Sequence, residues 1–96
     1  DHDDFDSFVV PLPEIGDPAA LAKRIASVAE NYSVLRMTGF VPVAGKTLRL
    51  LIQAVGPRVS HYYDRPWGAG EARRGSLVVI GLKGLDRAAV AKALVE

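Results

Sequence analysis

The strands that this sequence predicts carry apolar side chains on both of their faces, and this feature most constrains the fold. Side chains alternate between the two faces of a strand, so Phe40 points away from Met37, and Leu51 and Val55 point away from Ile52. Two predicted helices can cover only one face of such a sheet. The other face would expose Phe40, Leu51, Val55 and part of strand 76–82, a patch typical of interaction sites. The alternative is that these aliphatic side chains lie singly on an ordinary surface.

The predicted order of elements is β-α-β-β-β-α, an α+β fold in one domain. Asp17 followed by Pro18 is a typical helix start, and the short run Ala44-Gly45-Lys46 predicts a hairpin turn. We expect a four-stranded mixed, mostly antiparallel sheet with both helices on one face. The strands are expected at 5–12, 34–43, 47–55 with an extension toward Tyr63 after a bend at Gly56-Pro57, and 76–82. The helices are expected at 18–32 and, capped by Asp86, from there to the end of the chain.

The composition excludes several classes of function. Twelve basic and eleven acidic residues give a net charge of +1, unlike the basic surface of a nucleic-acid-binding protein. The absence of cysteine excludes disulfides and thiolate metal sites within this chain and fits a cytoplasmic protein. No apolar run is long enough to span a membrane. The motifs G-x-x-x-x-G-K-[ST], G-x-S-x-G and H-E-x-x-H are all missing, so we expect no catalytic activity from this chain.

Two histidines are candidate metal ligands. His2, Asp3 and Asp4 place an imidazole among carboxylates, which suits a peripheral site for Zn²⁺ or Co²⁺. The alternative is a solvated, fraying tail, because a lone histidine with flexible acids does not fix a closed site. His61 lacks a partner at metal-binding spacing, which favours an ordinary histidine near the end of a strand.

The predicted loop 64–75 is rich in arginine. If Arg58, Arg65, Arg73 and Arg74 converge, they could bind an anion or an acidic partner, because guanidinium groups hold phosphate and carboxylate bidentately. Alternatively they are solvated loop residues with one structural ion pair. We expect Trp67 to anchor the loop. We expect Asp64 to brace the loop by pairing with Arg65, Arg73 or Arg74.

Short stretches along nearly the whole chain resemble the C-terminal domain of the CobW family of P-loop GTPase metallochaperones. The stretch Asp64-Arg65-Pro66-Trp67 looks more like the cobalamin-biosynthesis branch than the zinc-homeostasis relatives. The matching stretches are Asp3-Asp4-Phe5-Asp6-Ser7-Phe8, Gly39-Phe40-Val41, Gln53-Ala54-Val55-Gly56, Tyr63-Asp64-Arg65-Pro66-Trp67 and Leu77-Val78-Val79-Ile80-Gly81.

The resemblance implies that residues 1–4 end a linker, often His-rich in this family, and that 5–96 form the C-terminal domain. It implies an accessory domain of a GTPase that delivers cobalt for cobalamin biosynthesis. Its partners would be the N-terminal GTPase domain of the same protein and a metal-receiving protein, with no nucleic acid and no membrane. GTP and Mg²⁺, and a metal-binding Cys-x-Cys-Cys motif, would belong to the GTPase half alone. The alternatives are an independent divalent-metal-binding module, a zinc-homeostasis metallochaperone domain, and a homo-oligomer in which sheets pair face to face.

Overall fold

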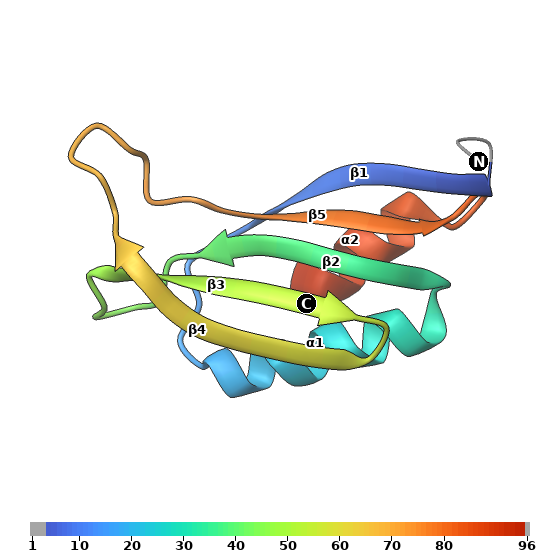
Figure 1. The fold of residues 1–96 in the computed structure, drawn as a ribbon, viewed down its shortest axis with the longest axis horizontal. Coiled ribbons are helices and arrows are strands. Elements are labelled where there is room, and N and C mark those ends of the chain that lie inside the picture. Colours follow the sequence, from blue (N-terminus) through green and yellow to red (C-terminus); the bar gives the residue numbers. More distant parts are fainter. Residues whose placement is uncertain (1–3, 96) are drawn as a thin grey trace.

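The computed structural model describes residues 4–95, which form one five-stranded sheet with two helices on one of its faces (Figure 1). The five strands are ordered β1-β5-β2-β3-β4 across the sheet, so β1 and β4 are its two edges. The elements are β1 (Phe5–Leu12), α1 (Pro18–Asn31), β2 (Val34–Val41), β3 (Leu48–Val55), β4 (Arg58–Pro66), β5 (Gly75–Leu82) and α2 (Arg87–Val95).

The α+β class and the placement of both helices on one face are confirmed, whereas the number of strands and the expected parallel pair are wrong. Gly56 and Pro57 form a two-residue hairpin turn, so the extension toward Tyr63 is a separate strand, β4. This additional reversal of the chain makes β5 run in the direction opposite to the one expected. As a result β5 pairs antiparallel with both β1 and β2, and every ladder between the named strands is antiparallel.

The local signals at the helix starts and at the first turn are confirmed. The Asp17 side chain accepts a hydrogen bond from the Ala19 N–H at 3.0 Å, and Pro18 occupies the first turn of α1, where its missing N–H has no cost. Asp86 caps α2 in the same way, through the Ala89 N–H at 3.0 Å. Gly45 adopts a φ of 77° in the turn between β2 and β3, a conformation that favours glycine.

The hydrophobic core lies between the sheet and the two helices. It consists of buried aliphatic side chains and one methionine, and no polar or charged residue among 4–95 is buried. Its fully enclosed members include Ile25, Val41, Leu77, Val79, Val90 and Leu94. No helix within residues 4–95 combines the length and the apolar character needed to cross a bilayer.

A β-bulge at the start of β2 changes which side chains reach the core. The pairing of β2 with β5 shifts register between Val34 and Arg36, so the strict alternation expected here is broken. Val34 is consequently buried and Leu35 is 38% exposed, the reverse of the faces that simple alternation predicts.

Candidate interaction surface

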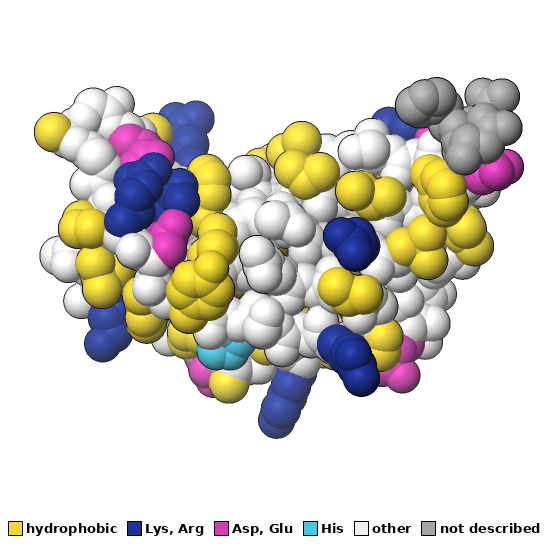
Figure 2. Space-filling view, viewed as in Figure 1, with side chains coloured by type: hydrophobic (Ala, Val, Ile, Leu, Met, Phe, Trp, Pro, Cys, Tyr) yellow, Lys and Arg dark blue, Asp and Glu magenta, His cyan; other side chains and the backbone are white. Residues whose placement is uncertain are grey.

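The face of the sheet opposite the helices, here called the open face, is not covered by any helix or strand of residues 4–95 (Figures 1 and 2). The strand registers place Phe5 beside Leu82, Val9 beside Val78, and Ile80 across from Arg36. One group of exposed apolar residues is gathered there, and we call it the open-face patch: Phe5, Val9, Leu35, Val55, Val78, Ile80 and Leu82.

A shallow hollow marks the part of the open-face patch nearest the start of β1. It is lined by Phe5, Leu35, Arg36, Val55, Gly56 and Ile80. Val55 is 55% exposed, and Phe5 is 45% exposed. The polar, uncharged residues Ser7, Thr38, Gln53 and Ser76 lie farther along the same face, and in Figure 2 much of its middle is white, the colour of the backbone and of the other side chains. Side chains this apolar and this exposed are typical of a surface that contacts another protein.

The two other residues expected on this face, Phe40 and Leu51, lie there but are half-buried. Phe40 is covered by its own chain. The Arg49 guanidinium lies 4.4 Å from the centre of the Phe40 ring, and the Trp67 ring meets Phe40 edge-on with centroids 5.7 Å apart. Trp67 therefore packs the loop between β4 and β5 against the open face, at the end of the sheet opposite the hollow.

Two carboxylates hold this loop through arginine pairs. Asp64 accepts hydrogen bonds from Arg49, with Nη2 to Oδ2 at 2.6 Å and Nε to Oδ1 at 3.0 Å. Glu71 binds Arg65 in the same bidentate way, at 2.9 and 3.0 Å, and also accepts the Gly68 N–H at 2.8 Å. The Arg65 guanidinium and the Gly68 N–H lower the pKa of Glu71 from 4.5 to about 2, and the hydrogen bond from Arg49 lowers the pKa of Asp64.

The four arginines considered as an anion site are not brought together. Arg58 begins β4 and Arg65 lies near its other end, about 23 Å away at the rise of an extended strand. Arg73 pairs with Glu14 at 3.0 Å, donates to the Lys46 carbonyl oxygen, and lies 5.8 Å from the Trp67 ring. Arg65 and Arg73 thus fasten the loop, and Arg74 is exposed within it. Anion binding by these side chains stays a prediction.

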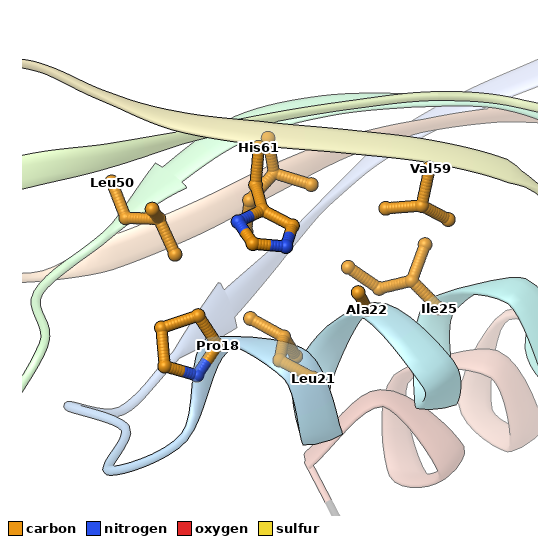
Figure 3. Close-up of a pocket in the computed structure, with 8 residues that line it drawn as sticks. Pro18, Leu21, Ala22, Ile25, Leu50, Val59 and His61 are labelled. Atoms are coloured by element: carbon orange, nitrogen blue, oxygen red, sulfur yellow. The ribbon is translucent and has the colours of Figure 1, made fainter.

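His61 points from β4 toward α1, not toward another potential ligand (Figure 3). Together with Val59 it covers a narrow apolar slot over Leu21, Ala22 and Ile25, and this slot does not admit a water molecule. His2 and Asp3 lie outside the described residues, and Asp4 is exposed with its carbonyl oxygen bound to the Lys83 N–H. Within residues 4–95, no three His, Asp or Glu side chains lie close enough together to hold a metal ion.

Arg49, Glu71 and Glu14 were not among the candidates that the sequence suggested. Arg49 occupies an open-face position between Leu48 and Leu50, in a strand with no other charged residue, and such an isolated charge is the one signal that could have identified it. The guanidinium paired with Asp64 belongs to Arg49, not to Arg65, Arg73 or Arg74, and Arg65 donates only its backbone N–H to the Asp64 side chain, at 2.8 Å.

The sheet, its two helices and the loop cluster define a small α+β domain, and comparison with known proteins identifies its family. Residues 5–96 match the family described as the cobalamin synthesis protein cobW C-terminal domain, so the chain belongs to the CobW C-terminal domain family. The match extends over the whole of the described fold.

Two curated relatives are both named zinc chaperone CobW. The protein from a Sinorhizobium species is 58% identical over 94 residues, and the protein from Pseudomonas aeruginosa is 49% identical over 88 residues. These alignments cover 98% and 92% of this chain but only 27% and 23% of the relatives. The chain therefore spans about a quarter of the length of the relatives it matches.

Among solved structures, the chain is similar to part of the Zn(II)-bound YjiA GTPase from E. coli. The TM-score is 0.74 with 28% identity, over 94% of this chain and 28% of that one. A triple mutant of the same GTPase, also Zn(II)-bound, gives a TM-score of 0.75. In these relatives too, the matching region is a minor part of a much longer chain.

Proposed function

We propose that this chain is the non-catalytic C-terminal domain of a metal-delivering GTPase, and that its open-face patch docks on the nucleotide-binding part of the same protein. The observation that carries the proposal is the open-face patch itself. A sheet with only one face covered leaves Val55, Ile80 and their neighbours in water, and a second protein surface would remove them from it.

The position of the chain's first strand supports this choice of partner. Phe5, the first residue of β1, lines the hollow in the open-face patch. In relatives about four times longer, a segment that enters the domain at this point would lie next to the patch. Docking within one chain also benefits from high effective concentration, so a modest patch is sufficient.

The metal would be cargo of the whole protein and not a cofactor of this domain. The names of the two curated relatives favour zinc over the cobalt that the resemblance implied. The alternative is an independent metal-binding module. Within residues 4–95, no group of three or more His, Asp or Glu side chains supports it. Interaction with a metal-receiving protein remains part of the proposal, with nucleotide state controlling how firmly the domain is docked.

The test is a titration of this chain into the separately produced GTPase part of the same protein, in its GTP-bound and GDP-bound forms. We expect binding that differs between the two forms. Val55→Glu and Ile80→Glu should each weaken it at least about tenfold, because a carboxylate would be buried without a partner. Val95→Glu is the matched control, since Val95 is 43% exposed but lies on α2. Absence of binding in both forms would refute the proposal.

A further inference from the structure

No strand within residues 4–95 pairs with the outer edge of β4, and this edge has few of the features that normally block pairing. Exposed edges are protected by charged side chains, prolines and bulges. In β4 these occur only near the ends, as the charged residues Arg58, Asp64 and Arg65, the bulge at Asp64 and the final Pro66. The five residues between them, Val59 to Tyr63, carry no lysine, proline or carboxylate. The opposite edge, β1, contains Pro11, which lacks an N–H.

The hairpin between β3 and β4 determines which backbone groups are free. Its turn residues are Gly56, with a φ of 55°, and Pro57, so Val55 and Arg58 form the hydrogen-bonded pair that closes the turn. Hydrogen-bonded pairs alternate with non-bonded pairs along an antiparallel ladder. The N–H and C=O groups of Val59, His61 and Tyr63 therefore point away from β3, toward the free edge.

We propose that β4 pairs antiparallel with β4 of a second copy of this chain, about a two-fold axis at His61. In this register the outward-pointing residues meet one another: His61 faces His61 of the second copy, and Val59 faces Tyr63 of the second copy. All of these are hydrogen-bonded pairs, and a β-branched residue opposite an aromatic ring is a favourable cross-strand pair. The two sheets join into one continuous sheet with closed two-fold symmetry.

Charge complementarity selects this register and this partner. The same two-fold places Arg58 of each copy opposite Asp64 of the other, and both side chains lie on the open face, where Asp64 already meets Arg49. Arg58 has no ion-pair partner within residues 4–95. A shift of the register by one residue in either direction would separate this pair and break the match of outward-pointing backbone groups.

Disulfide cross-linking tests the register directly, because the chain has no cysteine. Ser60 faces Tyr62 of the second copy in a non-hydrogen-bonded pair, whose Cα separation of roughly 4.5 Å suits a disulfide. Chains with Ser60→Cys are mixed with chains with Tyr62→Cys under mild oxidation. We expect a covalent dimer of one chain of each kind. A mixture of Ser60→Cys with Gln53→Cys is the matched control, because Gln53 lies on the same face but one strand inside the edge.

Sedimentation of the 96-residue chain provides an independent measurement. The parent chain should approach twice its monomer mass as concentration rises. His61→Pro removes a backbone donor that the parent sheet does not use and should abolish this increase, whereas His61→Ala should keep it. Circular dichroism shows whether His61→Pro still folds, and the cross-linking result decides the matter if it does not. Cross-linking no greater than in the Gln53→Cys control, or a parent chain that stays monomeric at millimolar concentration, would overturn the proposal.

Discussion

Gly39 is the position where one added carbon atom should disturb the sheet most. A Cβ at Gly39 would lie 1.9 Å from the Ser76 carbonyl oxygen and 2.9 Å from the Leu77 Cα, and both atoms belong to the backbone of β5. Ordinary contact begins at 3.4 Å, so β2 and β5 would have to separate at the centre of the sheet. Neither neighbour is a flexible side chain that could rotate away.

The cost of Gly39→Ala follows from this geometry. Overpacking costs about 1–3 kcal/mol, and losing two ladder hydrogen bonds adds about 1 kcal/mol each. We therefore expect a loss of about 3–5 kcal/mol, which is a large part of the roughly 5–14 kcal/mol that a chain of this size has in total. At roughly 4–8 °C per kcal/mol, the melting temperature should fall by at least about 12 °C.

Differential scanning calorimetry measures this change against Gly16→Ala. Nothing lies within 4 Å of a Cβ at Gly16, and its φ is not in the left-handed region. That substitution should leave stability unchanged or raise it by up to about 1 kcal/mol, because it restricts the unfolded chain. If Gly39→Ala melts within a few degrees of the parent chain, the close approach of β2 and β5 described above is wrong.

Two further predictions concern the loop that covers Phe40. Arg49→Ala removes both the cation over the Phe40 ring and the ion-pair partner of Asp64. The fluorescence emission of Trp67, the single tryptophan, should therefore shift to longer wavelength, because water reaches the indole. An unchanged emission maximum would contradict the packing of the loop. Glu71 has a folded pKa of about 2 against an ordinary 4.5, so its stabilising effect is complete above about pH 4.5 and is lost as the pH falls toward 2. Urea midpoints at pH 6 and pH 3 should differ less in Glu71→Gln than in the parent chain, and an equal difference would argue against the Arg65 pair.

The sequence predicted the elements with strong local signals. The Asp17-Pro18 start of α1 and the cap at Asp86 are side-chain interactions with neighbouring residues, so they are visible within a few positions of sequence. The separate strand β4 was missed because Gly56-Pro57 was interpreted as a bend, although a glycine at positive φ followed by proline makes a two-residue reversal. The wrong parallel pair followed from this single missed turn.

The open face was predicted in outline because it depends on the balance between apolar strands and helices. Its details depend on tertiary contacts. The bulge at Val34 exchanges the faces of Val34 and Leu35, and nothing in their local pattern indicates it. Likewise, the pairing of Arg49 with Asp64 depends on the offset between β3 and β4, which the sequence does not specify.

The central claim is that the open-face patch binds the nucleotide-binding part of the same protein. Chemical-shift mapping of the isotope-labelled chain with that part tests it most directly. We predict that the largest changes fall on Phe5, Val55, Ile80 and their neighbours on the open face, while the exposed residues of α1 stay unchanged. Changes confined to α1 and α2, with an unaffected open face, would contradict the account.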